Sequence, residues 1–354
     1  MTNIFETREE STPLSKRMPA EWEPQTAVQL TWPTASGDWK PVLSRVEPVF
    51  HAITTAIAQH QDVIISCGSD ADLSRLSHLY QNHARIRFYR ADNNDTWARD
   101  HGPISCYING ERELVDFMFN GWGNKYPSVH DNQISHQLLS SGAYGKTIMT
   151  TEHWVLEGGS LETDGAGTLL TTEQCLLNPN RNAGMTRTDI EHRLESALGI
   201  DRVLWLANGH LEGDDTDAHI DTLARFCNTN TIAYCQARQA DSHYTALRAM
   251  EKELQALRQR NGQPYQLLPL PLPSAIHNDD GERLPATYAN FLIINNAVLL
   301  PVYGVPEDLV AVERMMQAFP DRWVHPINCR PVIEQFGSLH CLTMQIHQET
   351  SDVQ

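Results

Sequence analysis

The stretch Gly213-Asp214-Asp215-Thr216-Asp217-Ala218-His219-Ile220-Asp221 places a histidine two residues before a carboxylate. On an extended strand, side chains two residues apart leave the same face, so we expect His219 and Asp221 to converge on one small ligand. A cysteine far downstream, Cys341, supplies the nucleophile that this pair lacks, on a second expected strand over residues 338–345. Cysteine, histidine and carboxylate together indicate covalent chemistry at an electrophilic carbon.

Polar clusters recur at the ends of expected strands along the whole chain. The intervals are 57, 62, 71 and 51 residues, between Asp100, Glu157, His219, Asn290 and Cys341. Strands and helices alternate throughout, and this spacing is typical of structural repeats that each deliver one residue to a shared centre. The other interpretation is that loops in any α/β protein recur at about this interval.

No linker composition divides the chain, so we expect one α/β domain over residues 18–347. Loose polar tails are expected at residues 1–17 and 348–354. Within the domain, Thr188 and Glu191 predict a capping box at the start of a helix, which should end at Gly199.

The composition is that of a globular protein, because 41% of its 354 residues are hydrophobic. It has 27 basic and 44 acidic residues, for a net charge of -17. Such acidity disfavours nucleic acid and anionic membrane surfaces as partners and favours a cationic small molecule, although it also serves solubility.

Seven cysteines are scattered without a Cys-x-x-Cys pair, which indicates neither a disulfide framework nor a zinc ribbon. No export signal or membrane-spanning run is evident, so we expect a cytoplasmic protein. The sequence leaves the oligomeric state open, with a homo-oligomer among the alternatives.

Five motifs carry a family resemblance. In chain order they are Trp97-Ala98-Arg99-Asp100-His101-Gly102-Pro103, Glu157-Gly158-Gly159-Ser160, Leu176-Leu177-Asn178-Pro179-Asn180-Arg181-Asn182, Asp215-Thr216-Asp217-Ala218-His219-Ile220-Asp221 and His340-Cys341. Together they resemble the agmatine deiminase and Porphyromonas-type peptidyl-arginine deiminase family, from about residue 18 to 347. The resemblance implies a pentein-type α/β propeller, with five ββαβ-like units in pseudo-fivefold symmetry around a central active site.

The activity that the resemblance implies is hydrolysis of a guanidino group to a ureido group with release of ammonia. No metal or cofactor is expected. Agmatine is the expected substrate of this C–N hydrolase, and N-carbamoylputrescine is the product, on the way to putrescine and the polyamines. Arginine, free or in a peptide, is the alternative substrate. A non-catalytic guanidinium-binding pentein and a cysteine amidase or protease are alternatives of other classes.

Four residues are predicted to be catalytic. The carboxylates of Asp100 and Asp221 would hold the flat cation through charge-assisted hydrogen bonds. The thiolate of Cys341 would add to the central carbon and, after ammonia leaves, form a covalent thiouronium intermediate. His219 would protonate the departing ammonia and then activate water. Because nearby carboxylates raise the pKa of a thiol, the cationic substrate is expected to help ionise the cysteine.

Substrate contacts are expected from Trp97, Glu157 and Asn290, with Asp95 and Trp122 as weaker candidates. Each of the first three also has a purely structural interpretation. The tryptophan could only anchor its loop, the glutamate could only order the Gly-Gly turn, and the asparagine could only tie backbone segments together.

Some features leave the substrate and a metal site open. Asp214, Asp215 and Asp217 could form a calcium loop, although the spacing is not that of an EF-hand. Arg225 could meet a substrate carboxylate or form a structural ion pair, and we favour the ion pair. Gln335-Phe336-Gly337-Ser338 stands where well-known agmatine deiminases have Gly-Gly-Gly-Asn, so fewer glycines precede the nucleophile.

Overall fold

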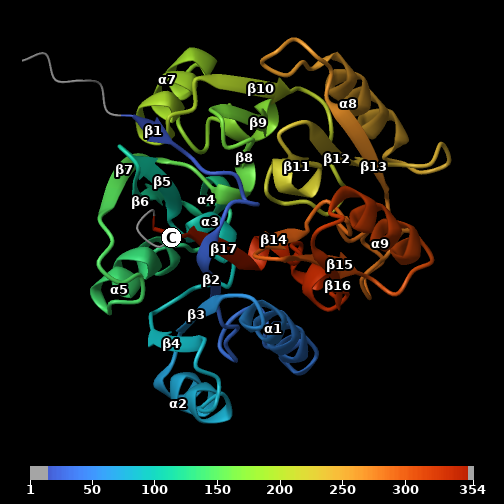
Figure 1. Cartoon of the computed structure of the whole chain (residues 1–354). Coiled ribbons are helices and arrows are strands. Elements are labelled where there is room, and N and C mark those ends of the chain that lie inside the picture. The colour runs from blue at the N-terminus through green and yellow to red at the C-terminus, as the bar shows by residue number, and fades with distance from the viewer. Residues whose placement is uncertain (1–14, 350–354) are drawn as a thin grey trace, which may run out of the picture.

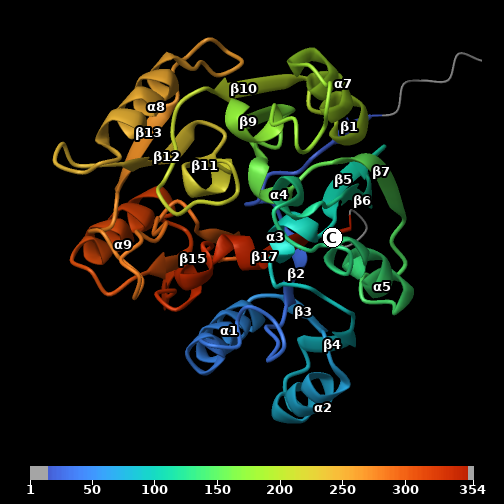
Figure 2. The same cartoon turned by 180° about the vertical axis from the view of Figure 1, so that it is seen from behind.

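The computed structural model describes residues 15–349. Over that range the strands form five small sheets of three or four strands each. Figure 1 and the reverse view in Figure 2 show the sheets set around a common centre, with the longer helices on the outside. The protein therefore has an α/β fold whose sheets all approach one central region.

One sheet joins the two ends of the chain. Its strands run in the order β17-β2-β3-β4, and β17 is antiparallel to β2 whereas β2, β3 and β4 are parallel. Long buried runs in β2 and β3 are typical of parallel strands that are covered on both faces. The elements are β2 (Gln25–Thr31), α1 (Leu43–Ala58), β3 (Asp62–Cys67), α2 (Asp70–Leu79), β4 (Ile86–Arg90) and β17 (Thr343–His347).

The second sheet has the order β1-β5-β6-β7. Its β5–β6 hairpin turns at Asn109 and Gly110, whose φ angles of 52° and 89° confirm the tight turn that this dipeptide favours. The elements are β1 (Lys16–Arg17), α3 (Ala98–His101), β5 (Ile104–Ile108), β6 (Glu111–Met118), α4 (Gly121–Asn124), η1 (Asp131–Gln133), α5 (Ile134–Ser140) and β7 (Met149–Val155).

The third sheet has the order β10-β9-β8. Helix α7 does have a capping box, but the predicted pair was wrong. Thr186 and Asp189 form it, because the helix begins at Arg187, and Gly199 ends the helix at φ 70° as expected. The elements are η2 (Gly158–Ser160), β8 (Glu162–Thr163), β9 (Thr168–Thr172), α6 (Glu173–Leu176), α7 (Arg187–Leu198) and β10 (Arg202–Leu206).

The last two sheets have the orders β11-β12-β13 and β14-β15-β16. The first contains η3 (Ile220–Thr222), β11 (Ala224–Asn228), β12 (Thr231–Gln236), α8 (Tyr244–Ala256) and β13 (Gln266–Pro271). The second contains β14 (Leu292–Ile294), β15 (Ala297–Val302), α9 (Glu307–Ala318), β16 (Trp323–Asn328), η4 (Val332–Gln335) and η5 (His340–Leu342).

The same strand pattern recurs in each of the five sheets of residues 15–349. An antiparallel pair is followed, after at least one helix, by a third strand parallel to the second, as in β11, β12 and β13. The pairs β17–β2, β5–β6, β8–β9 and β14–β15 are likewise antiparallel, and each leads into a parallel partner. This recurrence agrees with the near-regular spacing of the polar clusters in the sequence.

The expected tails are only partly visible. Residues 1–14 and 350–354 lie outside the described residues. Lys16 and Arg17 pair with β5 as strand β1, and the Gln348 N–H donates to the carbonyl of Pro24. Among the described helices, none is long and apolar enough to cross a membrane.

Candidate active site

The predicted catalytic residues lie on short helical turns where the sheets meet, and not on strands. His219 directly precedes η3, which carries Asp221. The prediction of an extended strand here was wrong, because Asp217 and Ala218 adopt left-handed φ angles of 65° and 61° and reverse the chain. The hydroxyl of Thr222 then donates to the His219 carbonyl at 2.8 Å and closes the turn.

Cys341 likewise lies in the helical turn η5, and β17 begins only at Thr343. The predicted strand was therefore placed too early, since the Leu342 N–H donates back to Leu339. Cys341 is 5% exposed, and its sulfur lies 3.7 Å from Asp221 Oδ2. Burial, Asp221 and Asp100 raise the pKa of the Cys341 thiol well above its ordinary value.

Asn290, two residues before β14, contacts the segment that carries Cys341. Its Nδ2 lies 3.2 Å from Cys341 Sγ and 3.4 Å from the carbonyl of Asp221. Its Oδ1 accepts the backbone N–H groups of His340 and Cys341 at 2.9 and 3.3 Å. The side chain therefore ties backbone together, as its structural interpretation requires, and also contacts the sulfur.

Asp100 is fixed by two donors. Its Oδ2 accepts the indole N–H of Trp122 at 2.9 Å, and its Oδ1 accepts the Gly159 N–H at the same distance. Burial raises the pKa of Asp100 to about 6, with Glu157 and Asp221 adding to the rise and His219 opposing it. Trp122, a weaker candidate in the sequence, therefore orients a carboxylate of the site.

Glu157 and His219 form a buried pair. His219 Nε2 lies 2.9 Å from Glu157 Oε2, which also accepts from Arg181 Nε at 2.7 Å. Burial opposes the charge of His219, but Asp100, Cys175 and Glu157 outweigh it and raise the pKa of the imidazole well above its usual value. Against the same penalty of burial, His219 and Arg181 lower the pKa of Glu157. An imidazolium beside a carboxylate is the charge state that a general acid requires.

Three buried polar atoms in this part of the structure have no hydrogen-bond partner among the described residues. They are Glu157 Oε1, His219 Nδ1 and Asp221 Oδ1. His219 Nδ1 lies 3.6 Å from Asp100 Oδ1, so the carboxylates surround the imidazole and the thiol. Because buried polar atoms are normally paired, these atoms indicate where a polar ligand would bind.

A cavity of about 490 Å³ leads to this cluster. Its buried side is formed by Asp100, Trp122 and Cys341, and its outer side by the exposed Asp38 and the half-buried Asp215. Of the described residues that line it, none is Lys, Arg or His. A cavity with carboxylates at both ends is suited to a ligand that carries positive charge at both ends.

Trp97 and Gly337 form one wall of this cavity. A Cβ on Gly337 would lie 2.2 Å from the Trp97 ring, so the one glycine kept in this segment is required by close packing. Phe336 lines the cavity in a left-handed conformation, with φ 65°. The segment therefore approaches the ligand space closely despite its low glycine content. Trp97 also packs against Trp39, with the ring centroids 5.6 Å apart, so it both anchors its loop and lines the cavity.

Asp95 also lines the cavity, and its Oδ1 accepts the Trp39 indole N–H at 3.0 Å. Burial raises the pKa of Asp95 to about 6.

Arg225 is fully buried and does not line the cavity. It pairs with Glu21 at 2.8 Å and with Glu162, and it donates to the Phe291 carbonyl at 2.7 Å. The structural ion pair that we favoured for this arginine is therefore confirmed.

The acidic stretch before His219 binds protein groups. Asp214 accepts N–H groups of its own loop, Asp215 accepts the Tyr126 hydroxyl at 2.8 Å, and Asp217 pairs with Lys125 and Arg181. With two cations already on one of these carboxylates, the loop does not have the free oxygen cage that calcium requires.

The group of described residues that could hold a metal is instead Glu157, Cys175 and His219, whose ligand atoms lie within 4.8 Å of one another. Arg181 already occupies the same Glu157 oxygen, and its positive charge opposes a cation there.

Sequence reasoning gave no role to Arg181, Cys175 and His340, which contact site residues, or to Glu21, which contacts His340. Arg181 and His340 stand inside recognised motifs, which was the available signal. Nothing in the sequence links Glu21 or Cys175 to its partner.

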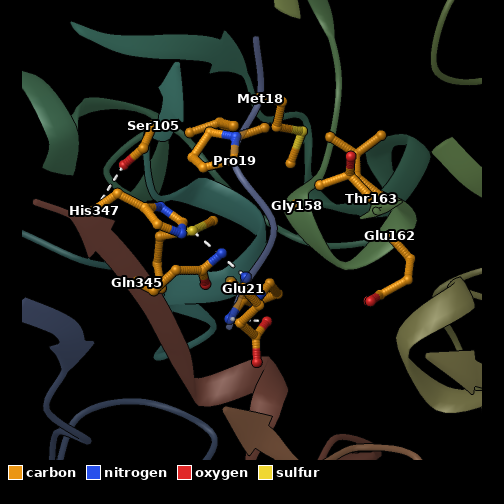
Figure 3. Close-up of a pocket in the computed structure, with 13 residues that line it drawn as sticks. Met18, Pro19, Glu21, Ser105, Gly158, Glu162, Thr163, Gln345 and His347 are labelled. Atoms are coloured by element: carbon orange, nitrogen blue, oxygen red, sulfur yellow. Dashed lines mark hydrogen bonds and ion pairs between the residues drawn. The ribbon is translucent and has the colours of Figure 1, made fainter. Parts of the chain in front are cut away.

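A second cavity, of about 420 Å³, is lined by immediate neighbours of the site residues, among them Arg99 and Gly158. Figure 3 shows it, with Glu21, Gln345 and His347 around it. Glu21 therefore lines a space other than the one that Cys341 lines.

Gly159 offers a direct test of this packing. A Cβ there would lie 2.5 Å from His219 Nδ1 and 2.8 Å from Asp100 Oδ1. We expect Gly159→Ala to lower kcat about 100-fold, because small displacements of reacting groups cost about that much. Steady-state kinetics measure the loss. Gly37→Ala is the control, since its Cβ would make only ordinary contacts at 3.5 Å or more. Unchanged kinetics in Gly159→Ala would contradict the placement of His219 and Asp100.

Comparison with known proteins agrees with this site. The model of the Porphyromonas-type peptidyl-arginine deiminase family matches residues 17–346. An agmatine deiminase of Ectopseudomonas mendocina is 33% identical over 353 residues, with 93% of this chain and 94% of the relative covered.

Solved structures give the same result. An agmatine deiminase of C. jejuni with substrate bound is 34% identical, with a TM-score of 0.89 and 97% and 99% of the two chains covered. A Porphyromonas gingivalis protein provisionally named an arginine deiminase is 49% identical, with a TM-score of 0.88 and coverage of 94% and 99%. These matches confirm the resemblance that the five motifs indicate. The chain belongs to the Porphyromonas-type peptidyl-arginine deiminase family.

Proposed function

We propose that this protein is a hydrolase that deiminates agmatine to N-carbamoylputrescine and ammonia. The observation that carries the proposal is the buried thiol of Cys341 beside Asp221, at the inner end of a cavity with carboxylates at both ends. A flat guanidinium cation supplies the positive charge that the described residues lining the cavity lack, and its N–H groups can donate to the carboxylates there.

The first half-reaction starts with the substrate between Asp100 and Asp221. Their carboxylates accept its N–H groups and fix its plane, and its charge stabilises the thiolate of Cys341. The thiolate adds to the guanidinium carbon and forms a C–S bond. The C–N bond then breaks as His219 donates a proton, and ammonia leaves a positively charged thiouronium on the sulfur. The thiol gives its own proton to solvent when it ionises, and the proton that departs in ammonia comes from His219, which is left neutral.

The second half-reaction hydrolyses this intermediate. His219, now neutral, takes a proton from a water molecule that attacks the same carbon. The C–S bond breaks, the ureido product leaves, and the thiol is restored. In this scheme Glu157 holds His219 in place through Nε2, so the unpartnered Nδ1 is the atom that moves protons.

The outer end of the cavity supports an amine tail on the substrate. Asp38 and Asp215 line it, and their carboxylates would bind the primary ammonium of agmatine. A carboxylate tail, as in arginine, would meet like charges there.

We expect Asp215→Asn to raise the KM for agmatine about tenfold or more with kcat little changed. A hydrogen bond to a charged group contributes about 1.5–3 kcal/mol, and the tail takes no part in bond breaking. Asp280→Asn removes the same charge from an exposed loop. It is the matched control for the long-range attraction between the negatively charged protein and the cationic substrate. Equal KM values for the two variants would contradict an amine subsite at Asp215.

Arginine is the second candidate substrate, because the 49% identical Porphyromonas gingivalis protein is provisionally named an arginine deiminase. The test is incubation with agmatine, free arginine and an arginine-containing peptide, with the ureido product measured in each. We expect kcat/KM to be highest for agmatine. Faster turnover of arginine or of the peptide would assign the activity to that substrate, and no turnover of any would favour a guanidinium-binding protein.

Further properties follow from the same proposal. We propose that the five sheets form a pentein-type propeller with the site on its pseudo-fivefold axis. Residues 18–347 would act as one catalytic domain, without a metal or cofactor. The described cysteines are all free thiols, which supports a cytoplasmic location. Assembly as a homo-oligomer stays a prediction.

A further inference from the structure

His340 connects the carboxylate beside the nucleophile to a second buried carboxylate. Its Nδ1 lies 2.8 Å from Asp221 Oδ2, and its Nε2 lies 2.7 Å from Glu21 Oε2. The imidazole is 1% exposed. An ionised carboxylate only accepts hydrogen bonds, so this arrangement calls for an N–H on both ring nitrogens, as in the imidazolium.

This contact leaves one oxygen of Asp221 for the substrate. Oδ2 binds His340, whereas Oδ1 is buried and has no partner within residues 15–349. Burial alone would raise the pKa of Asp221, but the hydrogen bond and the charge of His340 reverse the effect and lower it. A neutral Asp221 could still accept guanidinium N–H groups, but it would lose the charge-assisted part of those hydrogen bonds, so the charge of His340 bears directly on binding.

Several groups act on the charge of His340. Burial, Arg225 and Arg99 together lower the pKa of the imidazole below its ordinary value, and Glu21 and Asp221 offset part of that effect. The two carboxylates that contact the ring at 2.7 and 2.8 Å are therefore what sustains its charged form. Glu21 is itself held in place, because its Oε2 lies 2.8 Å from Arg225 and 3.7 Å from Arg99. Its Oε1 accepts the Ile293 N–H at 2.7 Å.

Glu21 stands outside the substrate cavity. It lines the second cavity, with Gln345 and His347 (Figure 3), whereas Cys341 lines the first. A change at Glu21 therefore acts on the substrate through buried neighbours such as His340, and not by direct contact.

We propose that His340 is a positioning residue that keeps Asp221 ionised with Oδ1 free for the guanidinium, and that Glu21 keeps His340 charged. The inference rests on the proposed deimination of a guanidino compound. It gives Glu21 a part in substrate binding, although two buried ion pairs, Glu21–His340 and His340–Asp221, separate this glutamate from the substrate.

The test is the pH dependence of His340→Leu. Without the imidazole, burial dominates and the pKa of Asp221 rises, so its charged form is lost at a higher pH. We expect the pKa of Asp221 to rise above that of Asp100, because loss of a neighbouring opposite charge and unopposed burial together raise the pKa of a carboxyl by several units, so that the acid limb of kcat/KM moves up by about 1 pH unit or more. In the parent protein the acid limb should follow Asp100, with its pKa of about 6.

Two further variants separate positioning from stability. Glu21→Gln keeps the shape of the side chain but removes its charge, and should move the limb in the same direction by a smaller amount. His347→Gln removes another buried histidine, whose Nε2 contacts the Ala20 carbonyl at 2.9 Å. It should lower Tm without moving the limb.

The same variants in a Cys341→Ser background give a readout without turnover, the Kd of agmatine measured by calorimetry against pH. An acid limb that stays in place in His340→Leu, for both kcat/KM and Kd, would overturn the inference while leaving the proposed function intact. If the Cys341→Ser variant without a second substitution bound no agmatine at any pH, that result would instead contradict the proposed function.

Discussion

Cys341→Ser is expected to abolish turnover of agmatine and to keep its binding. A serine hydroxyl has a far higher pKa than a thiol and has no base placed to activate it, so kcat should fall by about 10⁴-fold or more. The carboxylates of Asp100 and Asp221 stay in place, and the Kd of agmatine should therefore change little. Ammonia release measures the first quantity, and calorimetry measures the second.

Cys67→Ser is the matched control for this change. Cys67 is also a buried free cysteine whose pKa burial raises, to about 12, but it lies in β3 away from the cavity. Its replacement should alter stability only. Turnover that survives in Cys341→Ser, or that is lost equally in Cys67→Ser, would contradict the assignment of the nucleophile.

His219→Gln is expected to lower kcat by about 10² to 10⁴-fold, the usual contribution of a general acid and base. Glutamine can still donate a hydrogen bond to Glu157 but cannot move a proton to the leaving nitrogen. The parent enzyme should keep activity well above the ordinary pKa of histidine, because the pKa of His219 is raised and the imidazole stays protonated there. The pH profile of kcat measures the alkaline limb at which His219 loses its proton, and this limb should be absent in the variant.

His243→Gln is the control for His219. His243 is another buried histidine that pairs with a carboxylate, Asp241 at 2.9 Å, outside the candidate site. Its replacement should leave the pH profile of kcat unchanged. A kcat for His219→Gln within about twofold of the parent value would mean that another group moves the protons.

The charge balance of the site explains why the substrate takes part in its own activation. Burial, Asp221 and Asp100 all disfavour the thiolate of Cys341 in the free protein. A guanidinium between the same carboxylates adds a positive charge a few ångströms from the sulfur, which favours the thiolate. Ionisation of the nucleophile is therefore coupled to the arrival of a cation, and neutral amides would not trigger it.

The sequence predicted which residues come together at the site more fully than it predicted their local structure. His219, Asp221 and Cys341 lie in motifs that point to one chemistry, and the structure brings them together with Asp100. The strands predicted for them were wrong, because His219 directly precedes one helical turn, Asp221 lies in it, and Cys341 lies in another. The reversal at Asp217 and Ala218 gives no signal, since neither residue is a glycine.

The supporting residues were harder to predict for a different reason. Glu21 and His340 are more than 300 positions apart in the sequence, and only the antiparallel pairing of β17 with β2 brings the two ends of the chain together. One glutamate among 44 acidic residues has no pattern that marks it. Arg181 stood inside a recognised motif, yet its partner Glu157 could not be deduced from spacing alone.

The most direct test of the account is mass spectrometry of the protein quenched with acid during turnover of agmatine. The account predicts one adduct on the peptide that contains Cys341, with the mass of agmatine less one ammonia, and no adduct in Cys341→Ser. Active protein that carries no adduct at any quench time, or that carries it on another residue, would contradict covalent catalysis by Cys341.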